Sequence, residues 1–158
     1  MEKDWKIVPC ENSSEAPFQR SLHTLSVYKD SIYIFGGYDG SQRVNDFKEY
    51  HFNTQEWSTV IYTGIPPSPR DRHIAVVVKD TFYIFGGFDG SQRVNDFKEY
   101  HFNTKKWSQV AVVNGKPPTP RHSHAAAHYQ NSMFLFGGYD GSYRNDFHCF
   151  DFGKICKK

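Results

Sequence analysis

Histidine side chains are the first candidates for chemistry in this sequence. Eight are present, and His122, His124 and His128 are close enough in one stretch to suggest metal ligands on a strand face. However, His23, His73 and His124 occupy the same place in three copies of one pattern. Repeats spread equivalent residues apart instead of bringing them together. We therefore expect structural or surface histidines, no metal site and no cofactor.

Aspartate and asparagine recur in the same way. Asp39, Asp89 and Asp140 each precede a glycine, and an Asn-Asp pair follows at 45–46, 95–96 and 145–146. Paired carboxyl groups can serve acid–base catalysis, but side chains repeated in every copy suit turns, where they bond nearby backbone amides. The glycine-rich loops lead into a strand, not a phosphate-binding helix. We expect no catalytic residue and no enzyme activity.

A repeat of about 50 residues positions all these side chains. The segment 35–47 recurs at 85–97 with one change, Tyr38 to Phe88, and a third copy covers 136–147. This is the length of a four-stranded propeller blade. Each copy reads as a small apolar strand nearest the axis (23–28, 73–78, 124–129), a buried strand (32–35, 82–85, 133–136) and a third strand (47–52, 97–102, 147–152). A fourth strand begins at Trp57 and Trp107.

Composition restricts the class of protein. Lysine and arginine number 19 against 17 acidic residues, so the net charge of +2 provides no drive toward nucleic acid or membranes. The N-terminus is charged and no apolar run reaches membrane-spanning length. Three cysteines without metal-site spacing indicate free thiols in a reducing compartment. The expected location is the cytoplasm, with the nucleus left open.

The repeated motifs resemble those of the Kelch family. They are the double glycine after an apolar strand, Tyr-Asp-Gly, Asn-Asp, the spaced tryptophan and Pro-Arg-x-x-His. Their style is most similar to the leucine-zipper-like regulator and Rab-effector branch. The resemblance implies an all-β fold, a β-propeller usually of six or seven blades, that serves as a protein-binding platform.

The sequence holds only three blades, whereas a ring needs four to eight. We expect one Kelch domain over 1–158, with blades at 20–62 and 70–113 and three strands of a third blade at 121–152. The third copy lacks the tryptophan of its fourth strand, while Trp5 begins a matching strand at 4–9. We therefore favour a homodimer that closes six blades by exchanging this strand. The alternative is a piece of a larger propeller.

A partner-binding site is expected where the loops of the blades converge. The resemblance places such a site at the residue after each double glycine and at the arginine and its successor before each first strand. These residues, with a further arginine, are Arg20, Ser21, Tyr38, Arg70, Asp71, Arg72, Phe88, Arg121, His122 and Tyr139. Arginine and aromatic side chains dominate interface energetics. Arg43, Arg93 and Arg144 add positive charge to the same loops.

The expected function is protein–protein interaction. The positive loop face suits a polar or acidic peptide segment of a partner protein, which the chain would bind as an adaptor that recruits substrates. One alternative is a Kelch-type metalloenzyme of the oxidase or specifier kind. The other is a purely structural role.

Overall fold

The structure, a computed structural model, describes residues 3–153 and contains three antiparallel sheets that follow one another along the chain. The first blade contains β1 (Thr24–Tyr28), β2 (Ser31–Tyr38), β3 (Arg43–His51) and β4 (Glu56–Thr59) in that spatial order. The second contains β6 (Ile74–Val78), β7 (Thr81–Phe88), β8 (Arg93–His101) and β9 (Lys106–Gln109). The third contains β10 (Ala125–Tyr129), β11 (Ser132–Tyr139) and β12 (Tyr143–Asp151).

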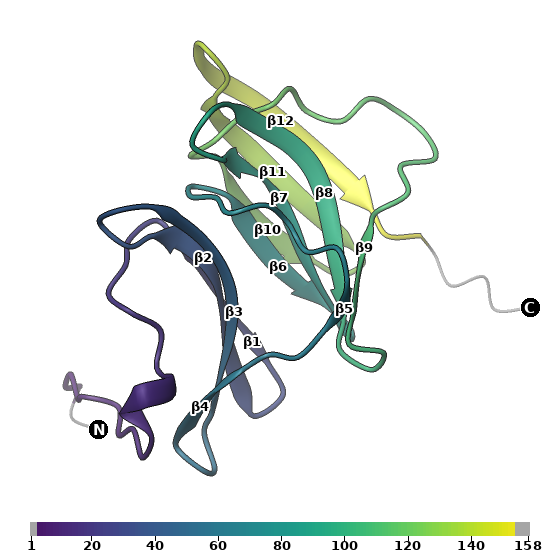
Figure 1. Cartoon of the computed structure of the whole chain (residues 1–158). Coiled ribbons are helices and arrows are strands. Elements are labelled where there is room, and N and C mark those ends of the chain that lie inside the picture. Colours follow the sequence, from purple (N-terminus) through teal and green to yellow (C-terminus); the bar gives the residue numbers. More distant parts are fainter. Residues whose placement is uncertain (1–2, 154–158) are drawn as a thin grey trace, which may run out of the picture.

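The blades fan out around the edge formed by their first strands (Figure 1). β6 contacts β1 on one side and β10 on the other, as expected of the strands nearest a propeller axis. A short 3-10 helix, η1 (Ser13–Glu15), lies beside β4. The two-residue strand β5 (Thr63–Gly64) runs parallel to β9, so the chain leaving the first blade binds the outer edge of the second.

The second strand of each blade is longer than the sequence suggested. β2, β7 and β11 continue through the double glycine, and the third strands begin four residues earlier than expected. A β-bulge explains this difference: the register shifts between Phe35 and Gly37, after which Gly37 pairs with Val44. Beyond the bulge, the last residues of these strands, Tyr38, Phe88 and Tyr139, pair with the first residues of the third strands.

Aromatic side chains fill the space between the blades. Phe35 and Phe47 of the first blade meet Phe82, Tyr100 and Trp107 of the second in one buried cluster. Trp107 is 1% exposed and closes the outer side of this cluster, as its sequence position indicated. The second blade is therefore apolar on both faces because a neighbouring blade covers each face.

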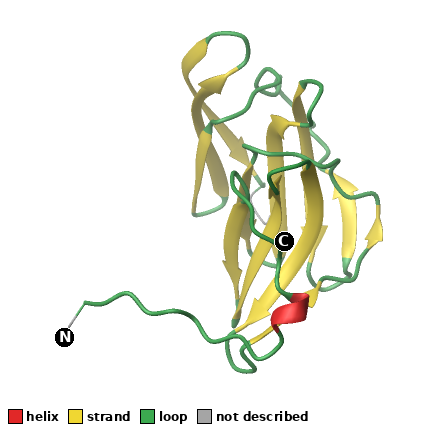
Figure 2. Cartoon of the chain, turned by 60° about the vertical axis from the view of Figure 1, so that its left-hand side comes forward, coloured by secondary structure: helices red, strands yellow, loops and turns green. Residues whose placement is uncertain are grey.

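The two ends of the stack lack such cover. Phe147, on the outer face of the third blade, is 68% exposed, and Leu25 and Val27 are exposed on the outer face of the first. No fourth strand pairs with β12 among residues 3–153. The expected strand over residues 4–9 is not formed in the single chain: this segment extends away from the sheets and Trp5 is fully exposed (Figure 2).

Candidate functional site

Three arginines are held by one arrangement that repeats in every blade. The guanidinium group of Arg70 donates two hydrogen bonds to the carboxylate of Asp96, at 2.6 and 2.9 Å. It also donates to the carbonyl oxygen of Gly86 and to both the carbonyl and hydroxyl oxygens of Ser68. The same bonds to a carboxylate and a glycine carbonyl join the equivalent residues, which are Arg20 with Asp46 and Gly36, and Arg121 with Asp146 and Gly137.

Arg20, Arg70 and Arg121, which were expected at an accessible partner-binding surface, are instead buried inside their own blades. Their side chains are only 4%, 1% and 1% exposed. Because a buried guanidinium group must find acceptors inside the protein, each arginine instead fastens the segment before a first strand to the third strand of the same blade. The bidentate bonds of Arg121 hold the pKa of Asp146 well below its usual range.

The Asn-Asp pairs belong to this clamp, so their assignment to turns was wrong. Asn45 and Asn95 donate to the carbonyl oxygens of Pro67 and Pro118 in the proline-rich segments. The Asp-Gly turns do follow the expected chemistry, since Asp39 and Asp89 accept hydrogen bonds from the backbone amides two and three residues later. The near-constant separation of arginine and aspartate, 25 or 26 residues, was the signal for the clamp in the sequence.

Two of the repeated histidines are buried between blades. The Nε2 atom of His73 lies 3.0 Å from the hydroxyl oxygen of Thr24, and that of His124 lies 3.2 Å from the carbonyl oxygen of Phe85. Burial lowers the pKa of His73 to about 3 and that of His124 to about 4, so both rings are neutral at pH 7. Within residues 3–153 no three His, Cys, Asp or Glu side chains are grouped closely enough to hold a metal ion.

The remaining predicted residues meet at the hairpin-loop end of the blades. Single β-bridges join Ser21 to Tyr38, Asp71 to Phe88 and His122 to Tyr139, so each double glycine brings its aromatic residue beside the start of its own blade. We name the surface they share with two further arginines the arginine–aromatic face. It consists of Tyr38, Arg43, Arg72, Phe88, Arg93, His122 and Tyr139.

Arginine side chains cross from one blade to the next on this face. The guanidinium carbon of Arg43, from the first blade, lies 4.7 Å from the ring centre of Phe88 in the second, and that of Arg72 lies 5.7 Å from the same ring. Arg93, from the second blade, lies 5.0 Å from the ring of Tyr139 in the third. Stacking on a ring restrains the arginine side chain while leaving its N–H groups able to bind an acceptor.

Asp71 contributes the carboxylate of this surface but is not itself accessible. It is 1% exposed and lies 3.0 Å from both the Nε atom of Arg43 and that of Arg72. Among residues 3–153 Arg93 forms no ion pair, and its buried Nε atom has no hydrogen-bond acceptor. Two of the three guanidinium groups on the face are therefore paired with Asp71, whereas that of Arg93 is not.

His122 lies in the middle of the face, between Phe88 and Tyr139. Burial, followed by the positive charges of Arg72 and Arg93, lowers the pKa of this ring. At neutral pH His122 therefore adds a polar ring without adding charge. Partly desolvated aromatic rings beside arginine are typical of the residues that dominate protein interfaces.

A backbone ladder fixes the position of Arg72 near the axis. Its amide donates to the carbonyl oxygen of Leu22, and its own carbonyl oxygen accepts from the amide of Ser123, at 3.0 Å each. All three residues have φ between 55° and 60° although none is glycine. Because such backbone conformations are disfavoured for these residues, they persist only where the surroundings hold them in place. The ladder thus holds neighbouring blades in fixed relation beneath the face.

The repeated blades and the clamp that fastens each one define the class: this is a Kelch-repeat protein with the blades of a β-propeller. A profile of the KLHDC2/KLHL20/DRC7 Kelch-repeats domain matches residues 1–155, and the chain belongs to this family. The expected all-β Kelch propeller fold is thereby confirmed, and closure of a six-bladed ring by a dimer stays a prediction. No helix among residues 3–153 has the length and apolarity required to cross a membrane.

Curated relatives agree with the expected branch of the family. The chain is 38% identical to the human leucine-zipper-like transcriptional regulator 1 over 145 residues, which are 88% of this chain and 17% of that protein. It is also 38% identical to the bovine Rab9 effector protein with kelch motifs over 135 residues, which are 82% of this chain and 36% of the relative. The chain therefore spans about a sixth and about a third of their lengths.

Proposed function

We propose that the chain is a protein-interaction module that binds an acidic segment of a partner protein at the arginine–aromatic face. The observation that carries this proposal is the set of three guanidinium groups on this face: Arg43 and Arg72 share the carboxylate of Asp71, and Arg93 stacks on Tyr139 without an ion pair among residues 3–153. Since Arg93 forms no ion pair among residues 3–153, a ligand carboxylate at its guanidinium group would displace no existing partner.

The shape of the face favours a peptide over a small metabolite. Its aromatic rings and arginines come from three different blades, so a ligand that contacts all of them must be extended. One relative supports a protein as the ligand, because it is named as an effector of Rab9. An adaptor that brings a bound protein to another component is the cellular role that this binding would serve.

Selection of displayed random peptides against the chain tests the proposal. We expect the selected peptides to be rich in aspartate and glutamate and to bind more weakly as salt rises, since the contacts are ionic. Replacing Arg43 and Arg93 together by glutamine should weaken binding at least about 10-fold, given about 1.5–3 kcal/mol for each hydrogen bond to a charged group. Asp71 would still be paired with Arg72.

The repeat itself provides a matched control. Lys29 and Lys79 lie in turns at the opposite end of the blades, and Gln130 occupies their position in the third repeat. The double variant Lys29→Gln with Lys79→Gln removes the same charge from a distant surface and should bind acidic peptides normally. Selection of neutral or basic peptides, or equal loss in the two double variants, would contradict the proposal.

A further inference from the structure

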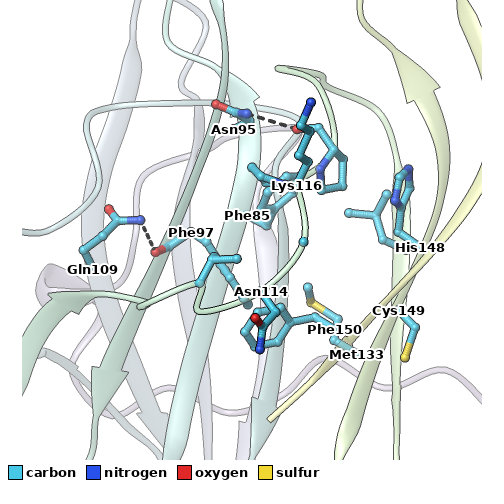
Figure 3. Close-up of a pocket in the computed structure, with 15 residues that line it drawn as sticks. Phe85, Asn95, Phe97, Gln109, Asn114, Lys116, Met133, His148, Cys149 and Phe150 are labelled. Atoms are coloured by element: carbon cyan, nitrogen blue, oxygen red, sulfur yellow. Dashed lines mark hydrogen bonds between the residues drawn. The ribbon is translucent and has the colours of Figure 1, made fainter.

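A cavity of about 220 Å³ lies between the second and third blades, on the side away from the axis. Figure 3 shows Phe85, Phe97, Met133 and Phe150 around it, contributed by β7, β8, β11 and β12. It is smaller than a typical site for a small molecule, which occupies about 300–1,000 Å³. Its size and apolar lining suit one large side chain.

The repeat identifies that side chain. In the preceding interface, between the first and second blades, Trp107 occupies the equivalent space and its ring lies 5.3–6.2 Å from the rings of Phe35, Phe47, Phe82 and Tyr100. One repeat later these four positions are Phe85, Phe97, Met133 and Phe150, all of which line the cavity. Tyr62 and Ile84 also belong to the Trp107 cluster, and their counterparts, Val112 and Leu135, line the cavity too. The cavity is therefore a tryptophan socket, defined by these six residues.

Among residues 3–153 the third blade lacks the strand that would carry this tryptophan. In the complete blades Trp57 pairs with Tyr50 and Trp107 pairs with Tyr100, on the outer edge of the third strand. The equivalent edge, that of β12 at Phe150, pairs with no strand among residues 3–153. The space beside Gly115, which occupies the position of Gly64 in the next repeat, is open for the same reason. A Cβ atom at Gly64 would contact the carbonyl oxygen of Trp107, whereas one at Gly115 would meet nothing within 4 Å.

The N-terminal segment has the sequence and the position of a fourth strand. Trp5 and Val8 are three residues apart, as are Trp57 and Val60 and also Trp107 and Val110. In both complete blades this valine is buried and its amide donates to the third strand. Trp5 itself is fully exposed, so its ring is not packed against any of residues 3–153.

Pro9 and Glu11, which follow Trp5, contact the first blade in the way that the chain leaving the first blade contacts the second. The hydroxyl of Tyr50 donates to the carbonyl oxygen of Pro9, as that of Tyr100 donates to Ile61. The amide of Glu11 donates to the carbonyl oxygen of Gln55, as that of Thr63 donates to Lys105. Pro9 and Glu11 follow Trp5 by the same distances at which Ile61 and Thr63 follow Trp57. The first blade is thus built to follow another blade whose fourth strand is 5–8.

From these contacts we propose that the tryptophan socket binds Trp5 of a second copy of this chain. Residues 5–8 of the partner complete the third blade of one chain, and the exchange is reciprocal. The register is fixed by the complete blades: the partner's Trp5 pairs with Phe150, the partner's Lys6 with Cys149 and the partner's Ile7 with His148. This inference is independent of the function proposed for the arginine–aromatic face.

The exchange also covers the two exposed ends of the stack. Phe136 and Phe147 on the outer face of the third blade are the counterparts of Phe35 and Phe47, which are buried against the next blade. Leu25 and Val27 on the first blade correspond to Ala75 and Val77, which pack in that same interface. Two identical new interfaces therefore close a ring of six blades with two-fold symmetry.

The mass of the particle in solution is the first test. A single chain has a mass of 18.4 kDa, and we expect twice that value by light scattering at micromolar concentration. Losing a tryptophan from the centre of an interface weakens binding about 30-fold or more. Since each dimer has two sockets, Trp5→Ala should raise the dissociation constant about 1,000-fold and leave a folded monomer.

Ile7→Thr is the matched control. Ile7 is nearly as exposed as Trp5 in the single chain, but its position corresponds to Thr59, which is exposed in a complete blade. If association were merely nonspecific contact between apolar termini, both substitutions would weaken it. The proposed register predicts a dimer for Ile7→Thr and a monomer for Trp5→Ala.

A disulfide tests the register directly and does not depend on a loss of stability. Ser108 donates to Glu99 across the pair equivalent to the partner's Lys6 and Cys149, so these side chains share a face. In a chain with Cys10→Ser and Cys156→Ser, the change Lys6→Cys should give oxidised dimers on a non-reducing gel. Ile7→Cys in the same background should not, because successive side chains point to opposite faces.

Two results would overturn the proposal. One is a wild-type particle with the mass of a single chain, which would assign the socket to a strand that residues 1–158 do not provide. The other is a dimer that survives Trp5→Ala and forms disulfides in equal yield with Lys6→Cys and with Ile7→Cys. Acidic-peptide binding by a monomer would still support the proposed function, so the two proposals fail separately.

Discussion

Replacing Arg70 by alanine is the sharpest test of the arginine clamp. The substitution removes five hydrogen bonds, of which two go to the carboxylate of Asp96 and one to the carbonyl oxygen of Gly86. Breaking a buried ion pair by deleting one partner costs about 3–5 kcal/mol. Because the Asp96 side chain is 30% exposed, water can partly hydrate the freed carboxylate. We therefore expect a loss near the lower limit, about 3 kcal/mol.

Chemical denaturation at one fixed protein concentration measures this loss, because association would otherwise change the apparent stability. Arg70→Lys keeps the charge but cannot form the bidentate pair, so it should recover only part of the lost stability. Arg93→Ala is the matched control: it removes a stacked arginine from the surface, for which about 0.5–1 kcal/mol is expected.

The opposite pattern would refute the reasoning. If Arg70→Ala changed the free energy of unfolding by less than about 1 kcal/mol yet abolished binding of a protein partner, Arg70 would be a contact residue, as the sequence first suggested. A double-mutant cycle with Asp96→Ala should give a coupling energy within about 0.5–3 kcal/mol, and additive effects would mean that the two side chains do not act as a pair.

Two further outcomes follow from residues between the blades. His73 and His124 have pKa values lowered to about 3 and 4, so the unfolded chain binds more protons than the folded chain between pH 6.5 and 4. The free energy of unfolding should therefore fall by about 2 kcal/mol per histidine from pH 7 to pH 5. Denaturation of a variant with glutamine at both positions should show a flatter dependence of this free energy on pH. Gly86→Ala should lower the thermal stability more than Gly40→Ala. Both glycines have positive φ, but a Cβ atom at Gly86 would lie 2.8 Å from the ring of His124, whereas one at Gly40 would meet nothing within 4 Å.

Much of the fold could be predicted because it repeats. The spacing of the double glycines located every blade, and the tryptophans marked the outer strands and the interfaces between blades. The same comparison singled out Trp5, whose contacts in a complete ring remain a prediction. The bulge was not predicted, because Gly36 and Gly37 looked like the end of a strand although pairing resumes after them.

The candidate site was only partly predictable. Sequence position brought Tyr38, Phe88, Tyr139, Arg72 and His122 to one surface, as the structure has them. It could not separate exposed from buried arginines, because a repeated arginine looks the same whether its acceptor is a ligand or an aspartate 26 residues away. Asp71 was expected at the accessible surface because it occupies the position that Ser21 has in the first repeat. In the structure Asp71 is buried beneath Arg43 and Arg72, with which it forms ion pairs.

The near-identity of the first two repeats has a consequence for how the chain folds. Residues 40–54 and 90–104 are the same, so β3 and β8 present the same edge to an incoming strand, and β4 could bind either. Only the four-residue connection at 52–55 keeps β4 next to its own partner, through the high local concentration that a short tether provides. When chains refold close to one another, β4 of one chain can pair with β8 of another as readily as with its own β3. The resulting misassembled oligomers compete with correct assembly.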